Sequence, residues 1–285
     1  MKMTSEQIDR ERRTGRVAGI LGLIGVALFI LSGFVGGSDY TGADGLAEQM
    51  DAFADEKGAV LAQLLVQAIG LALFAAPLMA LFGAARDRSD AVRPGLIGVT
   101  IAGPLFFAGS LIALYLALDA AIDPFQSAGG LGQLSDDDAR DILHDQSAFS
   151  VYGGLDFAGR LGLIFAMIYT SMHAMRTGLM SRFWGTLGMA LGAALLFIGP
   201  SALLVFAFAA SLLVANLWPG GRPPAWGEGK AMPWPKPGEA LAGKGGPVAD
   251  PEEPARPEDF EGSATEVTPE TAEPSETRQK RKKRR

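Results

Sequence analysis

The chain has 285 residues, 48% of them hydrophobic, and a formal net charge of -6. It has no cysteine, which excludes disulfides, iron–sulfur clusters and thiol catalysis. Its two histidines, His144 and His173, are predicted on opposite sides of a membrane, which excludes a histidine metal site within one subunit. We therefore expect no metal and no cofactor.

The chain is dominated by long apolar stretches separated by charged loops. A helix crosses the hydrocarbon core of a bilayer with about 20 apolar residues, and residues 17–35, 59–82, 95–118 and 151–173 meet this requirement. The first stretch follows a polar segment, residues 1–16. We interpret it as a retained helix rather than a signal peptide, because it is long and is preceded by Glu6, Asp9 and Glu11.

A fifth apolar region, residues 184–217, would be roughly 50 Å long as one helix. The sequence Gly199-Pro200-Ser201 favours a reversal, because proline disfavours helix continuation and suits a helix start. Two short passes, residues 184–199 and 201–217, would then place Trp184 and Trp218 at one interface. The predicted fold is an all-α bundle of six transmembrane helices over residues 17–218, with one long helix or a re-entrant hairpin as alternatives.

Positive charge alternates from loop to loop. Short loops rich in Lys and Arg stay in the cytoplasm. On this basis, residues 1–16 and the loops after the second and fourth spans are cytoplasmic, and both termini face the cytoplasm. The cytoplasmic group comprises Lys2, Arg10, Arg12, Arg13, Arg16, Arg86, Arg88, Arg93, Arg176 and Arg182, whereas the opposite loops contain only Lys57 and Arg140 among many acidic residues.

Residues 219–285 have the composition of a disordered cytoplasmic tail, rich in Pro, Gly, Glu and Ala. The tail ends in a basic run, Lys280, Arg281, Lys282, Lys283, Arg284 and Arg285. This run is predicted to bind anionic lipid head groups at the membrane surface, and a solvated end without a partner is the alternative. Nucleic acid is not an expected partner.

Asp156 and Arg160 form the most informative pair in the sequence. They lie four residues apart in the fourth span, on one helical face, in the outer half of the membrane. Ionisable residues at membrane depth usually face the bundle interior or a water-filled cavity. The functional hypothesis is a site open to the outside, in which Arg160 meets an anionic group. The structural alternative is an ion pair that serves only the fold.

Further polar side chains are predicted at the same depth: Gln63 and Gln67 in the second span, Asp119 at the end of the third and Tyr152 at the start of the fourth. Convergence of these groups would form a binding pocket for a small polar or anionic solute. Hydrogen bonding between helices is the alternative for the glutamines.

Three other patterns favour structural roles. Asp136, Asp137 and Asp138 follow Ser135 and are typical of a helix start rather than a calcium loop. Leu46, Met50 and Phe53 form a stripe that is expected to rest on the bundle. Small residues, namely Gly188, Gly192, Ala158 and Gly162, are predicted to let helices approach closely.

The stretch from Asn216 to Trp226, which contains Trp-Pro-Gly-Gly-Arg-Pro-Pro-Ala-Trp, is followed by Pro-Trp-Pro at residues 233–235. Over residues 10–235 the chain resembles uncharacterised six-span membrane proteins of high-GC bacteria, which end in a similar segment. The resemblance implies a bacterial inner membrane but no known activity, so no site residues are transferred from it.

Two hypotheses of function follow. The first is a membrane protein that binds or transports a small polar or anionic solute through an outward-facing pocket around Arg160. The second is a membrane anchor or scaffold that acts through its cytoplasmic tail. An enzyme is not favoured, because no nucleophile–base pair or set of metal ligands is predicted at membrane depth.

Overall fold

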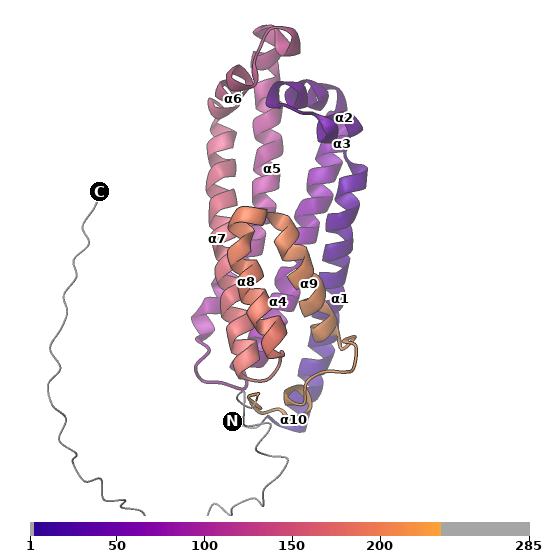
Figure 1. Ribbon diagram of the computed structural model, residues 1–285, viewed down its shortest axis with the longest axis vertical. Coiled ribbons are helices and arrows are strands. Elements are labelled where there is room, and N and C mark those ends of the chain that lie inside the picture. Colours follow the sequence, from indigo (N-terminus) through magenta and orange to yellow (C-terminus); the bar gives the residue numbers. More distant parts are fainter. Residues whose placement is uncertain (1–2, 235–285) are drawn as a thin grey trace, which may run out of the picture. The chain divides into compact units, whose positions relative to one another are not determined.

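The computed structural model describes residues 3–234, and within them every regular element is a helix, as predicted (Figure 1). The long helices are α1 (Ser5–Val35), α3 (Leu46–Leu73) followed by α4 (Ala75–Arg86), α5 (Ile97–Ser127) and α7 (Ser147–Arg176). Four candidate membrane spans are long and apolar enough to cross a bilayer, when α3 and α4 are counted together and η1 is joined to α5. The described part of the chain is thus a helical bundle compatible with a membrane protein.

The predicted reversal occurs at Gly199, where α8 (Arg182–Ile198) gives way to α9 (Pro200–Ala215). Gly199 has a φ of 71°, which glycine adopts easily, and Pro200 opens α9, where its missing N–H costs nothing. The Trp184 and Trp218 rings lie 5.2 Å apart, so the two ends of the hairpin are adjacent, as predicted. The hairpin turns back partway along α7 (Figure 1).

The helix predicted over residues 59–82 is longer and is interrupted. It begins at Leu46 and breaks at Phe74, between α3 and α4. Pro77 explains the break, because it cannot donate to a carbonyl one turn earlier and its ring crowds that carbonyl. The start of α3 carries the predicted apolar stripe, in which Met50 and Phe53 are fully buried.

The short elements gather at the two ends of the bundle (Figure 1). α2 (Ser38–Gly42) and α6 (Asp136–His144) lie beside the start of α3, whereas α10 (Ala225–Glu228) lies at the opposite end, near the start of α1. Two 3-10 turns complete the fold, η1 (Pro94–Leu96) before α5 and η2 (Gly130–Gly132) before α6.

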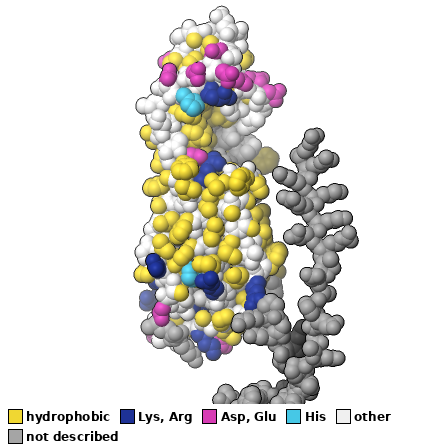
Figure 2. Space-filling model, turned by 60° about the vertical axis from the view of Figure 1, so that its left-hand side comes forward, with side chains coloured by type: hydrophobic (Ala, Val, Ile, Leu, Met, Phe, Trp, Pro, Cys, Tyr) yellow, Lys and Arg dark blue, Asp and Glu magenta, His cyan; other side chains and the backbone are white. Residues whose placement is uncertain are grey.

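The charges separate as the sequence predicted. One end of the bundle holds the start of α1, the α4–α5 loop, the α7–α8 loop and residues 216–234; we call it the arginine-rich end. The other holds α2, α6 and the start of α3; we call it the acidic end. Figure 2 shows a band of hydrophobic side chains between charged regions on one face. Residues 5–16, predicted as a separate polar segment, are simply the first turns of α1.

Glycines allow the closest helix contacts. A Cβ on Gly103 of α5 would lie 2.6 Å from the Gly162 carbonyl carbon of α7, so these backbones touch directly. Gly188 and Gly192 of α8 also lie at close helix contacts, as predicted: Gly188 meets the side chains of Ser171 on α7 and Phe206 on α9, and Gly192 meets that of Met167 on α7. The prediction for Ala158 is wrong: Ala158 is exposed, because the face of α7 that meets α5 passes through Gly159 and Gly162 instead.

Candidate functional site

The predicted pair on α7 is present. Arg160 Nε lies 2.8 Å from Asp156 Oδ2, and the two side chains are 29% and 19% exposed. The guanidinium carbon of Arg160 also lies 5.3 Å from the centre of the Phe107 ring on α5, within the range of a cation–π contact. Asp156 and Phe107 therefore hold Arg160 from two sides while part of it stays accessible.

The pair lies near the level at which the α8–α9 hairpin ends. Gly192 of α8 packs against Met167 of α7. The last residue of α8, Ile198, lies about 9 Å further along its axis. Arg160 lies about 10 Å from Met167 along α7, in the same direction because the helices are antiparallel. From this level toward the arginine-rich end, α8 covers α7. Toward the acidic end, the hairpin does not cover α7.

The other predicted site residues do not bind Arg160. Asp119 forms an ion pair with Lys57 of α3 instead, at 2.7 Å, and both side chains are more than 40% exposed. Gln63 packs beside Gly36, and its Oε1 is buried without a hydrogen-bond partner among residues 3–234. Gln67 makes no side-chain hydrogen bond in that range, although it is half-buried.

The Tyr152 ring packs at a tilt against that of Phe149, with ring centres 5.5 Å apart. In the described part of the chain, none of Gln63, Gln67, Asp119 and Tyr152 makes a hydrogen bond or ion pair with Arg160. The sequence predicted that these side chains share one depth in the membrane, and this depth stays a prediction. It did not fix the direction in which each side chain points around its helix.

At the acidic end, the three aspartates begin α6, as predicted. Ser135 caps the helix, and its own amide donates to Asp138 Oδ2 at 2.9 Å. Asp136 has a second role, because its Oδ1 accepts a hydrogen bond from the amide of Ala47 at 2.9 Å. It thereby caps α3, whose N-cap residue, Gly45, has no side chain for the purpose.

Residues 219–234, which composition places in the disordered tail, are packed on the arginine-rich end. The indole N–H of Trp226 donates to the carbonyl of Leu179 at 2.9 Å, and that of Trp234 donates to Met180 at 2.8 Å. The amide of Met3 donates to the carbonyl of Gly229 at 2.9 Å. The compact unit therefore extends to Trp234, because aromatic side chains anchor a segment that its proline and glycine content alone would leave unfolded.

Arg88 is the buried charge of this end, and its side chain is 0% exposed. It donates to Glu11 Oε2 at 2.9 Å, to the carbonyl of Ala84 at 2.9 Å and to the carbonyl of Ala225 at 3.0 Å. From the sequence, Arg88 was expected to act only as a topology charge. No local pattern distinguishes it from Arg86, because its partners other than Ala84 come from α1 and from residues more than 130 positions later.

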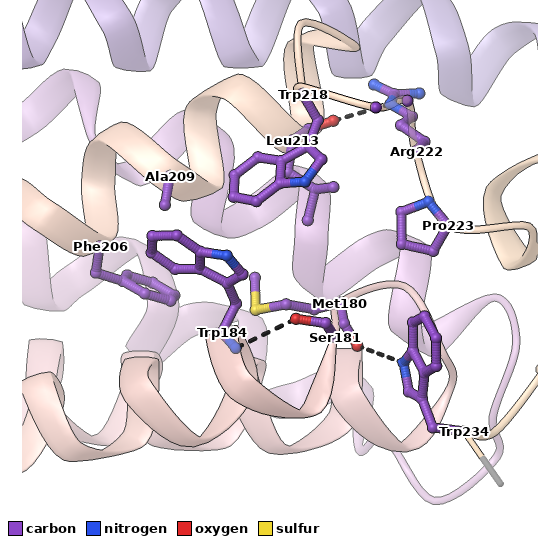
Figure 3. A pocket seen from close by; sticks show the side chains of 12 residues that line it. Met180, Ser181, Trp184, Phe206, Ala209, Leu213, Trp218, Arg222, Pro223 and Trp234 are labelled. Atoms are coloured by element: carbon purple, nitrogen blue, oxygen red, sulfur yellow. Dashed lines mark hydrogen bonds between the residues drawn. The ribbon is translucent and has the colours of Figure 1, made fainter. Parts of the chain in front are cut away.

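Two cavities adjoin residues 220–224 of this packed segment. The first has a volume of about 260 Å³ and opens between α8 and α9 (Figure 3). The second has a volume of about 540 Å³ and lies against α1. Arg222 and Pro223 line both. This region was not predicted from the sequence, although all four tryptophans of the chain fall within or beside it.

Comparison with protein-family models, with curated proteins and with solved structures gave no match. The predicted lipid-binding run, Lys280, Arg281, Lys282, Lys283, Arg284 and Arg285, lies outside the described residues. The described part thus offers two regions with chemistry of their own: the Asp156–Arg160 pair, and the cavities beside Arg222.

Proposed function

We propose that the chain is a multi-pass protein of a bacterial inner membrane, with the arginine-rich end in the cytoplasm. The four long apolar spans support a membrane location. The concentration of arginines in the segments at one end of the bundle supports this orientation. In this topology the hairpin enters from the cytoplasmic side and returns to it, and Arg160 lies in the outer half.

Within this topology, the protein binds a small polar or anionic solute at Arg160 from the outer side. The observation that carries this proposal is the partly exposed ion pair beside the end of the hairpin, where α8 stops covering α7. A carboxylate or phosphate forms a strong, geometrically specific pair with a guanidinium. Asp156 and Phe107 keep the guanidinium in place, and a solute that also carries an ammonium group pairs with Asp156.

The test is ligand-dependent thermal unfolding of the detergent-purified protein. Sodium phosphate, acetate and glycine are added in turn to wild type and to Arg160→Leu. We expect at least one of them to raise the Tm of wild type and not that of the variant. Arg140→Leu is the matched control, because Arg140 forms an exposed pair with Asp137 at 2.6 Å on α6 and should leave the ligand effect intact.

A stability cycle separates the solute site from a purely structural pair. If Asp156→Leu and Arg160→Leu each destabilise the protein and the double variant recovers the loss, the pair serves the fold. If Arg160→Leu leaves the stability unchanged or raises it, the arginine is retained for a ligand. No ligand effect in wild type together with full recovery in the double variant contradicts the proposal.

The second candidate is a membrane anchor or scaffold that acts through the chain after Trp234. Trp234 is bonded to Met180 and accepts a hydrogen bond from Arg182 at 3.0 Å, so the chain leaves the bundle at the arginine-rich end. Deletion of residues 240–285 separates the two candidates. A solute binder keeps its ligand response after the deletion, whereas a scaffold loses its partners or its distribution in the membrane.

A further inference from the structure

The smaller cavity is an aromatic slot with a cationic mouth. Phe206 lies at one end of it, the indoles of Trp184 and Trp218 meet edge to face on its wall with ring centres 5.2 Å apart, and Arg222 and Trp234 stand at the other end (Figure 3). Leu213 and Ala209 of α9 complete an apolar wall. A slot of this shape accepts a linear aliphatic group whose polar end stays beside Arg222.

The larger cavity continues from the other side of Arg222 and is polar. Three arginines, Arg12, Arg16 and Arg222, line it together with Glu11 and Glu228. Glu11 is already engaged by the buried Arg88 at 2.9 Å, and Glu228 lies 4.0 Å from Lys230. Arg16 has no ion-pair partner within residues 3–234, so positive charge is in excess here.

Arg222 is held in place but keeps donors to spare. Its Nε and Nη2 donate to the carbonyls of Leu213 and Val214 at the end of α9, and its guanidinium carbon lies 4.5 Å from the centre of the Trp226 ring. Its Nη1 makes no hydrogen bond within the described residues. Burial, and then the neighbouring arginines, lower the pKa of Arg222 to about 10, against the opposing effect of Glu11. The guanidinium remains charged at neutral pH in a site that an anion would stabilise.

We propose that these two cavities form one binding site for an anionic amphiphile, an anionic phospholipid of the cytoplasmic leaflet. The phosphate binds Arg222 with Arg16 and Arg12, and part of an acyl chain enters the aromatic slot between α8 and α9. Basic pockets on the cytoplasmic side of membrane bundles suit lipid head groups. Tryptophan at both edges of the slot suits the boundary between head groups and chains. This site is distinct from the basic run at residues 280–285, and it rests only on the proposed membrane location and orientation, not on Arg160.

The tryptophans of the site provide the measurement. Bromine on an acyl chain quenches nearby indole fluorescence, so brominated phosphatidylglycerol and brominated phosphatidylcholine are titrated into the detergent-purified full chain. We expect the anionic lipid to half-saturate the quenching at a concentration at least tenfold below that of the zwitterionic lipid. Arg16→Gln should raise this concentration about fivefold, as expected for one basic contact. Arg93→Gln is the matched control, because Arg93 is exposed at the same end and lines neither cavity.

Three further arms make the result decisive. Ala209→Phe fills the slot and should abolish quenching while leaving the arginines unchanged, and its melting curve confirms folding. Arg160→Leu should bind the lipid like wild type, so a failure here is distinguished from a failure of the solute site. Inorganic phosphate should compete only weakly. Any of three results would overturn the proposal. The two lipids quench equally, Arg16→Gln and Ala209→Phe have no effect on quenching, or phosphate displaces the lipid at the same concentration as phosphatidylglycerol does.

Discussion

Replacement of Arg88 by leucine should cost the protein roughly 3–5 kcal/mol of unfolding free energy. Arg88 is 0% exposed and joins α1, the end of α4 and residues 225–226 through one guanidinium. Its loss leaves the Glu11 carboxylate, 12% exposed, without its cation, and the carbonyl of Ala225 without its donor. An uncompensated buried charge dominates this cost, because a lost neutral hydrogen bond contributes only about 1 kcal/mol.

The double variant Arg88→Leu, Glu11→Leu tests that reasoning. It removes both charges, so what remains is the loss of the Arg88 donors at the carbonyls of Ala84 and Ala225, at about 1–3 kcal/mol each. Unfolding of the detergent-purified protein is followed by tryptophan fluorescence, which reports this end directly because Trp226 lies 5.7 Å from Arg88. Arg86→Leu is the control: Arg86 forms an exposed pair with Asp87 and should cost under about 1 kcal/mol. A result in which Arg88→Leu costs no more unfolding free energy than Arg86→Leu would refute this reasoning. A double variant that is no more stable than Arg88→Leu alone would also refute it.

Three further predictions concern packing, pH and capping. Gly103→Ala should destabilise the protein by about 1–3 kcal/mol in thermal unfolding, because its Cβ meets the backbone of α7; Gly98→Ala, on the same helix with nothing within 4 Å, should be neutral or slightly stabilising. Burial raises the pKa of Glu11 above its ordinary value of 4.5, despite the nearby Arg88. The protonated Glu11 carboxyl therefore contributes stability that is complete below pH 4.5 and is lost as pH rises through the raised pKa of the folded protein. The stability of wild type relative to Glu11→Gln should therefore fall with rising pH, and a rise would contradict this. Asp136→Ala should loosen the first turn of α3 by about 1 kcal/mol, seen as faster amide hydrogen exchange there and not in α7.

The sequence was most informative where a local rule applies. Gly199 and Pro200 mark a reversal whatever surrounds them, and the spacing of Asp156 and Arg160 places them on one face of any helix. Those rules concern φ and helical period, which neighbouring residues determine. The reversal and the ion pair could therefore be predicted from the chain alone, before any tertiary contact was known.

The arginine-rich end could not be predicted in this way. Depth along a helix follows from counting residues, but the direction of a side chain follows from its neighbours, which is why Asp119 meets Lys57 and not Arg160. The indole N–H of Trp226 bonds to the carbonyl of Leu179, 47 residues earlier in the chain, and its ring contacts Arg88 and Arg222. Amino-acid composition carries no information on such single contacts. A prediction from composition therefore assigned residues 219–234 to the disordered tail.

Arg88 bonds to residues far later in the chain, and this has a consequence for biosynthesis. Its carbonyl partner at Ala225 emerges from the ribosome 137 residues after Arg88 itself, when all the long helices are already made. Until then its Nε lacks that acceptor, although Glu11 and Ala84 are already present, so residues 225–226 do not yet close this end of the bundle. Closure of this end is accordingly the last step of assembly, and a nascent chain that stops short of residue 225 exposes a charged, unfinished surface on which quality-control proteases can act.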